Sequence, residues 1–309
     1  MGDISKECIA EICGIAEKHG TKALVKEPLS RHTSFKVGGE CACFAEINSA
    51  ECLTDMLGYI RANRVPYYII GRGTNLIVDD GYIPFIFLHL GSGFADMRVE
   101  GDRIICQSGA SLSAVCGFAA DNSLTGLEFA YGIPGRIGGA VFMNAGAYGG
   151  EMKDVTAYAK AIDESGCVKR FEGKDLKFSY RKSIFSENRY IITEVCLKLN
   201  KGDKSEITAK MNELMQRRRD KQPIELPSAG STFKRPIGSY AGMLIEQCGL
   251  KGYRCGGAMV SEKHSGFVVN VDNASFSDIM AVIEHVREAV YEKTGYLLEC
   301  EPEIIRAQR

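Results

Sequence analysis

Several patterns that would assign a protein to a class at once are missing from this sequence. Its 12 cysteines include no Cys-x-x-Cys pair, the spacing typical of zinc ribbons and thioredoxin-like sites. No apolar run approaches the ~20 residues that span a bilayer, and residues 1–19 carry acidic groups where a secretory signal would need an apolar stretch. We therefore expect a cytoplasmic protein with reduced thiols, no metal site and no membrane partner.

An excess of charge of one sign is also missing. The chain carries 38 lysines and arginines against 39 aspartates and glutamates, a net charge of -1 at pH 7. No overall field therefore attracts it to nucleic acid or anionic lipid, and any basic patch for an anionic ligand must be local. Hydrophobic residues make up 45% of the sequence, as in soluble globular proteins. Its 309 residues suffice for two or three domains.

The order of expected strands and helices changes along the chain. Strands alternate with helices in the first third, which is typical of α/β or α+β folds. Beyond Asp96, strands predominate up to a long helix over residues 205–219. Two prolines within residues 222–227 indicate a domain boundary. We expect an α+β protein of three units, at residues 1–94, 95–220 and 221–300. Residues 301–309 are expected to return as a strand to the first unit.

A glycine-rich pentapeptide, Gly71 to Asn75, directly follows an expected strand. Glycine lets the backbone approach a ligand closely, and successive amides can form a nest for an anion. The segment is not a Walker loop, because no Gly-Lys-Ser/Thr follows, and it lacks the third glycine of a Rossmann fingerprint. Taken alone, an ordinary tight turn explains it at least as well.

A second glycine-rich segment is more specific. Residues 132–150 hold seven glycines and three alanines. So many small residues indicate close backbone approach to a ligand that is bulky and flat or polyanionic, although a crowded junction of helix and strand is the alternative. Pro134 can open a short helix whose N-terminus points at phosphate. Two such loops, neither of Rossmann type, predict a dinucleotide held between two subdomains.

The two loops resemble those of the FAD-binding domain of the vanillyl-alcohol oxidase type. The sequence of the second loop is similar to the corresponding loop of the UDP-N-acetylenolpyruvoylglucosamine reductases. Four further segments are similar to motifs of that family, and the matches run from about residue 31 to the C-terminus. Their sequences are RHTSFKVGG at 31–39, YRKSIF at 180–185, PSAGSTFKRP at 227–236 and VSEKHSGF at 260–267. The chain is compact, like the subfamily that lacks a tyrosine loop over the substrate.

This resemblance implies a two-subdomain FAD-binding fold followed by a C-terminal α+β substrate-binding domain. It also implies non-covalent FAD, NADPH as co-substrate, and reduction of an enolpyruvyl ether on UDP-N-acetylglucosamine to UDP-N-acetylmuramate in peptidoglycan precursor synthesis. We expect a monomer that acts on this small nucleotide sugar and binds no nucleic acid. The expected cofactor-binding residues are Gly71, Arg72, Gly73, Thr74, Asn75, Leu76, Gly132, Ile133, Pro134, Gly135, Gly138, Gly139, Ala140, Asn144, Ala145, Gly146 and Ala147.

The resemblance also implies three catalytic residues. Hydride addition to the alkene spreads negative charge over the substrate carboxylate, and the guanidinium of Arg181 suits that charge. Ser231 is the implied proton donor to the other alkene carbon, and Glu301 is expected to orient the carboxylate or relay a proton. The terminal motif, usually Glu-Val-Arg-Ile-Ile, reads Glu-Pro-Glu-Ile-Ile here. Counting from Gly295 favours Glu301 and leaves Glu303 as the alternative.

Other residues are expected to bind the substrate or to preserve the family pattern. Thr74 replaces the usual serine and keeps its hydroxyl. The substrate bears a diphosphate and a carboxylate, so local polar and cationic groups are required. The candidates are Tyr180, Arg217, Lys221 and Lys263. The run of arginines at 217–219 is explained equally well as a solvated helix face, favourable at a C-terminus.

Two other functions stay open at this point. A different flavoenzyme on the same fold, such as an alcohol or sugar-lactone oxidase, would use oxygen to reoxidise the flavin. A non-catalytic FAD- or nucleotide-binding module would predict the loss of Ser231, Arg181 or the terminal glutamate, but all three positions are filled.

Overall fold

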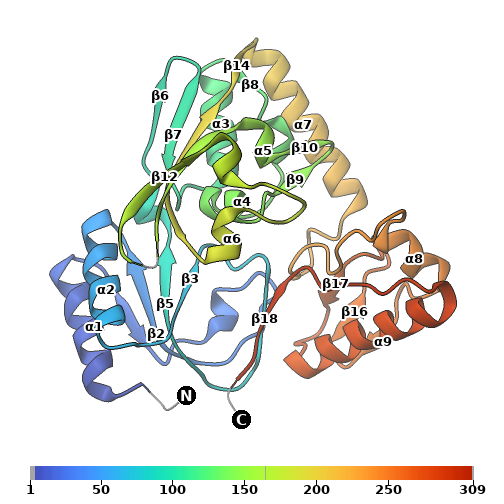
Figure 1. Cartoon of the computed structure of the whole chain (residues 1–309). Coiled ribbons are helices and arrows are strands. Elements are labelled where there is room, and N and C mark those ends of the chain that lie inside the picture. Colours follow the sequence, from blue (N-terminus) through green and yellow to red (C-terminus); the bar gives the residue numbers. More distant parts are fainter. Residues whose placement is uncertain (1–3, 164, 308–309) are drawn as a thin grey trace.

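The computed structural model describes residues 4–163 and 165–307, and its elements form three bodies, each with its own sheet (Figure 1). In Figure 1 the N-terminal body lies at the lower left, the central body at the top and the C-terminal body at the right. This mixture of parallel and antiparallel sheets with helices confirms the predicted α+β class. The predicted boundaries at 94/95 and 220/221 stay predictions.

The N-terminal body is a four-stranded sheet in the order β1-β2-β5-β3, parallel except for β1. Helix α2 follows Ser49, whose hydroxyl accepts a hydrogen bond from the Cys52 amide, and it buries apolar residues from one face, at 53, 56, 57 and 60. Both α1 and α2 pack beside β2 (Figure 1). The elements are α1 (Lys6–Lys18), β1 (Ala23–Val25), η1 (Leu29–Arg31), β2 (Cys41–Ile47), α2 (Ala50–Ala62), β3 (Tyr67–Ile70), β4 (Leu76–Val78), β5 (Ile83–Leu90) and η2 (Ser92–Phe94).

The central body is a five-stranded antiparallel sheet in the order β12-β11-β13-β7-β6, with its helices gathered on one face. Its elements are β6 (Met97–Glu100), β7 (Arg103–Gln107), α3 (Leu112–Asp121), β8 (Leu124–Thr125), η3 (Glu128–Ala130), α4 (Ile137–Phe142), β9 (Gly146–Ala147), β10 (Gly150–Glu151), α5 (Met152–Val155), β11 (Thr156–Ile162), β12 (Val168–Glu172), η4 (Gly173–Leu176), α6 (Ile184–Asn188), β13 (Ile191–Lys198), β14 (Asn200–Lys201) and α7 (Lys204–Lys221).

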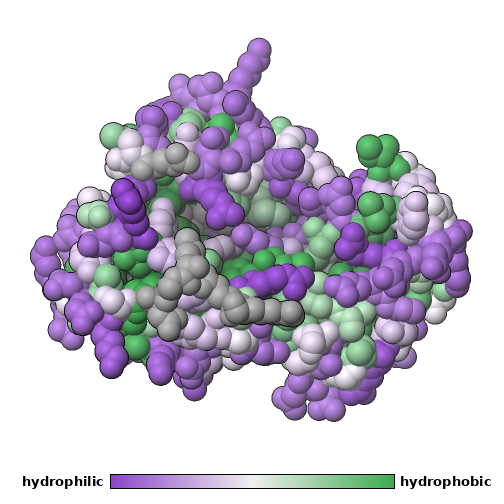
Figure 2. Space-filling model, turned by 60° about the horizontal axis from the view of Figure 1, so that its bottom comes forward, coloured by the Kyte–Doolittle hydropathy of each residue, from purple (hydrophilic) through white to green (hydrophobic). Residues whose placement is uncertain are grey.

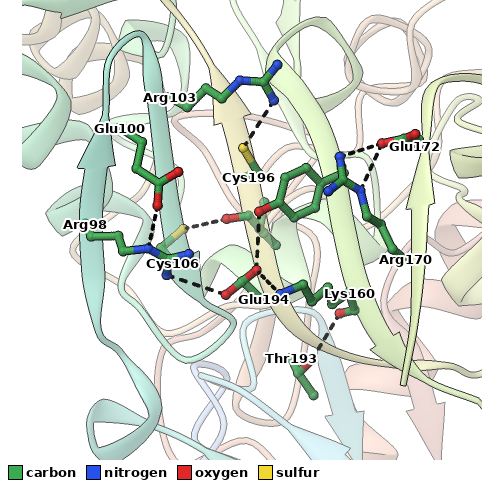
Figure 3. A network of polar contacts seen from close by, with 12 residues as sticks. Arg98, Glu100, Arg103, Cys106, Lys160, Arg170, Glu172, Thr193, Glu194 and Cys196 are labelled. Carbon is green, nitrogen blue, oxygen red and sulfur yellow. Dashed lines mark hydrogen bonds and ion pairs between the residues drawn. The ribbon is translucent and has the colours of Figure 1, made fainter. Parts of the chain in front are cut away.

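Charged pairs cover the other face of this sheet. Figure 3 shows Glu194 of β13 between Lys160 of β11, at 2.9 Å, and Arg98 of β6, at 3.6 Å. Arg170 and Glu172 pair at 2.6 Å along β12. Because none of these charged residues lines the cavity that Arg181 and Glu301 share, we assign this face to the scaffold.

The C-terminal body is a small antiparallel sheet, β15-β16-β17, packed against the long helix α9. Helix α9 begins after the capping box of Ser275 and ends at Gly295, whose φ of 75° is left-handed. Beyond it the chain returns to the N-terminal body, where β18 pairs in parallel with β4. The elements are α8 (Ala241–Gln247), β15 (Arg254–Cys255), β16 (Ala258–Val260), β17 (Val268–Asn270), α9 (Phe276–Thr294) and β18 (Glu303–Ile305).

The surface is mainly polar on the face that Figure 2 shows, with apolar residues in separate patches. Within the described residues, no helix is both long and apolar enough to cross a bilayer. The 12 cysteines all lie in the described part of the chain and are free thiols, and burial raises the pKa of Cys43 above its usual range.

Candidate active site

A cavity of about 620 Å³ opens between the central and C-terminal bodies. Its walls come from the turn before α6, the loop that leads to α8, α8 itself, the loop before β17 and the terminal segment. The lining residues are Tyr180, Arg181, Ser231, Phe233, Arg235, Tyr240, Ala241, Gly242, Met243, Glu246, Gln247, Lys263, His264, Ser265, Gly266 and Glu301. All three residues expected to be catalytic are among them, so segments far apart in the sequence meet in one place.

An ion pair within the cavity joins Arg181 to Glu301. Arg181 Nε donates to Glu301 Oε1 at 2.7 Å, and the two side chains are only 21% and 12% exposed. Arg181 lies at the tip of a tight turn closed by two backbone hydrogen bonds between Ser179 and Lys182. Its φ of 57° is left-handed, an uncommon conformation for arginine that the tight turn imposes.

Two loops hold Glu301 in place from opposite sides. Its amide donates to the carbonyl of Thr232 at 2.9 Å, next to Ser231. On the other side, Asn75 Nδ2 donates to the Glu301 carbonyl at 3.4 Å, and the Asn75 carbonyl accepts from the amide of Glu303. The terminal segment is therefore clamped between the serine loop and the first glycine-rich loop.

The geometry distinguishes the two candidate glutamates. Glu303 lies outside the cavity, where its carboxylate accepts a hydrogen bond from the Tyr68 hydroxyl at 2.7 Å. Glu301 faces the cavity, and burial raises the pKa of its carboxyl although Arg181 and Lys234 oppose that change. A raised pKa lets a carboxyl keep its proton more readily, which suits a group that relays protons.

Ser231 is presented by an anchored loop. The Thr232 amide donates to the Gly266 carbonyl at 2.8 Å, and the Thr232 hydroxyl accepts from the Val268 amide at 2.9 Å. Thr232 is buried, whereas Ser231 is exposed toward the cavity. The anchored neighbour therefore fixes the direction of the serine without occupying its hydroxyl.

Three other lining residues contact groups of the surrounding chain. Tyr180 accepts a hydrogen bond from the Arg235 amide at 3.0 Å, and Lys263 lies 3.5 Å from Glu225. His264 Nδ1 accepts from the Gly266 amide at 3.1 Å, and burial lowers the pKa of this histidine. A neutral imidazole that supports the backbone is a structural element of the cavity wall.

Two of the residues expected to bind substrate do not reach this cavity. Arg217 lies with its guanidinium 5.1 Å from the ring of Tyr148 and 3.8 Å from Glu213. Lys221 is exposed at the end of α7. The middle arginine of the run, Arg218, instead donates to the carbonyl of Gly132. The expected binding roles of Arg217 and Lys221 thus gain no support from their positions.

The two glycine-rich loops lie directly against each other. The Thr74 hydroxyl donates to the Pro134 carbonyl at 3.1 Å, so the hydroxyl at this position joins them. Gly73 has a φ of 59°, and a Cβ there would lie 2.1 Å from the His32 carbonyl oxygen. A side chain at Gly138 would meet Ser108 at 2.7 Å. These two glycines are required by the backbone itself.

Asn144 supports the second loop from inside. It is fully buried, and its amide group donates to Glu151 Oε2 at 3.0 Å and to the Ser179 carbonyl at 2.9 Å. Its side-chain oxygen accepts from the amide of Lys153. Because these bonds occupy the side chain, Asn144 ties the loop to the turn that carries Arg181.

Partnerless polar atoms gather where the loops meet. The buried side-chain atoms without a hydrogen-bond partner among the described residues include Ser108 Oγ and Arg136 Nε. Buried polar atoms are normally paired, so an unpaired one indicates a missing partner. The glycine-lined backbone and the unpaired atoms together fit a bound nucleotide cofactor. Its diphosphate would be held by the loops at 71–76 and 132–147.

Known proteins resemble this chain over most of its length. A model for an FAD binding domain matches residues 41–172, and one for the C-terminal domain of UDP-N-acetylenolpyruvoylglucosamine reductase matches residues 222–305. A UDP-N-acetylenolpyruvoylglucosamine reductase from Caldanaerobacter subterraneus subsp. tengcongensis is 48% identical over 283 residues, which cover 92% of this chain and 93% of the relative.

One from Clostridium botulinum is 48% identical over 285 residues, 91% of this chain and 92% of the relative. The chain belongs to the UDP-N-acetylenolpyruvoylglucosamine reductase family. A crystal structure of the reductase of this family from Thermus caldophilus superposes with a TM-score of 0.79 at 34% identity, covering 92% of this chain and 98% of that one. The predicted family, and the predicted FAD-binding fold with a C-terminal α+β domain, are confirmed.

Sequence patterns had not indicated two of the polar residues where the glycine-rich loops meet, Arg136 and Ser108. Arg136 stands alone among small residues in the second glycine-rich loop, and that isolated charge was the available signal. Ser108 is distant in sequence and carried none. Asn75 was expected to bind cofactor, but its contact with the terminal segment depends on the pairing of β18 with β4.

Proposed function

We propose that this chain reduces the enolpyruvyl ether of UDP-N-acetylglucosamine to UDP-N-acetylmuramate with FAD and NADPH, a step of peptidoglycan precursor synthesis. The reaction is inferred from membership of the reductase family. One observation supports the proposal that it takes place in this cavity. Arg181, Ser231 and Glu301, from three distant segments, line one cavity whose wall is held by the first glycine-rich loop.

FAD, when bound, supplies the hydride carrier that links NADPH to the alkene. The chain contributes the two loops that hold it non-covalently, at residues 71–76 and 132–147. The Thr74 to Pro134 hydrogen bond keeps the loops together. The clamped segment that carries Glu301 connects them to the catalytic groups.

Arg181 has the chemistry to bind the substrate carboxylate. A guanidinium can grip a carboxylate through two parallel hydrogen bonds, and its attraction grows as negative charge develops on that group. Glu301 already shares this guanidinium at 2.7 Å. When the substrate carboxylate also lies beside Arg181, it and the Glu301 carboxylate repel each other if both are ionised. Substrate binding therefore favours protonation of Glu301.

Ser231 is the proposed proton donor to the second alkene carbon. A serine hydroxyl is a weak acid and needs a proton source behind it. Glu301 is suited to that supply, directly or through water, because burial raises the pKa of its carboxyl. Tyr180 and Lys263, which line the same cavity, are the proposed contacts to the rest of the nucleotide sugar.

We propose that the enzyme works in the cytoplasm as a monomer. Its partner is a small nucleotide sugar, and neither nucleic acid nor membrane is involved. The net charge of -1 supports this view, because it provides no general attraction to polyanions.

A steady-state assay tests the function against an oxidase on the same fold. The FAD-loaded chain should oxidise NADPH only when the enolpyruvyl nucleotide sugar is present, with one NADPH consumed per UDP-N-acetylmuramate formed. UDP-N-acetylglucosamine lacks the alkene and serves as the control. Alcohol-dependent consumption of oxygen without any need for NADPH would instead establish an oxidase.

A further inference from the structure

Two arginines come together where the glycine-rich loops meet, outside the lining of the catalytic cavity. Arg72 belongs to the first loop and Arg136 to the second. The Arg136 side chain crosses the first loop closely, because a Cβ on Gly71 would lie 3.1 Å from Arg136 Cγ. The hydrogen bond from Thr74 to Pro134 fixes the loops in this position.

One atom of the partly buried Arg136 side chain has no hydrogen-bond partner among the described residues. That atom is Nε, which is itself buried. Burial is the main cause that lowers the pKa of Arg136, and the charge of Arg72 is the second. The neighbouring charge that acts on Arg136 is therefore another cation. A partly buried charge beside a like charge is unfavourable, and an anion between the two would compensate both.

The positive field extends to a neighbouring histidine. Burial, then Arg136 and then His32 lower the pKa of His89 to about 4. His89 is therefore neutral near pH 7 and does not add to the positive charge; burial is the main cause of its lowered pKa, and Arg136 contributes to it. The ligand that fits here carries negative charge and can accept hydrogen bonds from N–H groups.

We infer that Arg136, together with Arg72, binds the diphosphate of FAD and selects the dinucleotide over flavins without a diphosphate. The inference rests on the proposed function, because it takes FAD to be the cofactor. A planar guanidinium matches phosphate oxygens through paired hydrogen bonds, and the unpaired Arg136 Nε would gain an acceptor. The nucleotide sugar also has a diphosphate, but the cavity assigned to it includes neither arginine.

The test measures ligand affinity of the flavin-free protein. Flavin fluorescence gives dissociation constants for FAD and for riboflavin, which has no phosphate, in the wild type, Arg136→Ala and Arg136→Lys. Arg98→Ala, on the distant β6, removes the same charge as a control. We expect Arg136→Ala to weaken FAD binding about 10- to 100-fold, the scale of a charged hydrogen bond. Riboflavin binding should stay within about 2-fold, and Arg136→Lys should be intermediate.

Three results would overturn the inference. These are unchanged FAD affinity in Arg136→Ala, equal losses for FAD and riboflavin, and a loss of affinity for UDP-N-acetylglucosamine in place of FAD. The last would assign the arginine to the diphosphate of the sugar nucleotide. Arg136→Lys retains a cation and shows whether the loops still fold if Arg136→Ala does not. A wild-type chain that binds no FAD would refute the proposed function itself, a result separable from any effect of Arg136.

Discussion

Arg181 and Glu301 meet at 2.7 Å although 120 residues separate them along the chain. The turn of the central body presents the arginine, and the tail that returns to the N-terminal body presents the glutamate. The active site therefore exists only when all three bodies are assembled, and its chemistry depends on contacts that hold the tail.

Replacing the arginine should change both catalysis and the acidity of its partner. In Arg181→Met the main group that lowers the pKa of the Glu301 carboxyl is gone, so the pKa set by burial rises further. We expect flavin reoxidation by substrate to slow about 100-fold or more, with its pH profile shifted to higher pH. Lys182→Met, an exposed neighbour in the same turn, is the control. A rate within about 2-fold of wild type would contradict the role of Arg181.

A pair of glutamate variants tests the register of the terminal motif. Glu301→Gln keeps the shape of the side chain but removes the proton relay, so reoxidation should slow about 100-fold or more. Glu303→Gln, which retains an acceptor for the Tyr68 hydroxyl, should react at nearly the wild-type rate. Stopped-flow absorbance distinguishes the two, and the reverse order of effects would assign catalysis to Glu303.

The proton donor can be isolated from the hydride step. Ser231→Ala should be reduced by NADPH at the normal rate, while recovery of flavin absorbance on adding substrate slows about 100-fold or more. Ser231→Cys retains a proton donor and should recover part of that loss. If Ser231→Ala recovers its absorbance as fast as wild type, the serine does not donate the proton.

Two glycine variants test whether Gly73 is required for its backbone conformation. Gly73→Ala places a side chain at a φ of 59° and 2.1 Å from the His32 carbonyl, so the loop must shift. We expect a loss of about 1–3 kcal/mol in the free energy of unfolding, together with weaker FAD binding. Gly58→Ala in α2 meets nothing within 4 Å and should stabilise by about 0.5–1 kcal/mol. Thermal melts that rank these variants in the opposite order would contradict the model of the loop.

Acid should destabilise the apoprotein partly through His89. Its pKa of about 4 in the folded chain lies below the value of 6.5 expected when unfolded, so the unfolded state binds the proton more readily between these values. Its contribution to stability is present above pH 6.5 and is lost as the pH falls toward 4. His89→Gln should flatten this part of a plot of unfolding free energy against pH, and an unchanged slope would contradict it.

Local motifs were sufficient to predict part of this site. Arg181 and Ser231 sit in short segments that resemble family motifs, and both line the cavity. Spacing from Gly295 favoured Glu301 but left Glu303 open, because which carboxylate faces the cavity depends on how the tail lies beside Asn75. Arg217 was expected near the substrate for its charge alone, but packing of α7 directs its neighbour Arg218 to the glycine-rich loop.

Long-range contacts account for the remainder. Arg136 Nε, which has no acceptor among the described residues, lies near Arg72 only because the two loops meet, a consequence of how the N-terminal and central bodies pack. The isolated charge of Arg136 among small residues is visible in the sequence, but its unpaired Nε and its closeness to Arg72 are not. The sequence therefore predicts which loops would hold a cofactor, whereas only the structure shows that Arg136 and Arg72 lie close together where those loops meet.

The most direct test follows the flavin absorbance of the FAD-loaded chain without oxygen. NADPH should bleach the absorbance near the visible flavin maximum, and the enolpyruvyl nucleotide sugar should then restore it in a single turnover. A chain that takes up no flavin, or a bleached flavin that the nucleotide sugar cannot restore, would contradict the account.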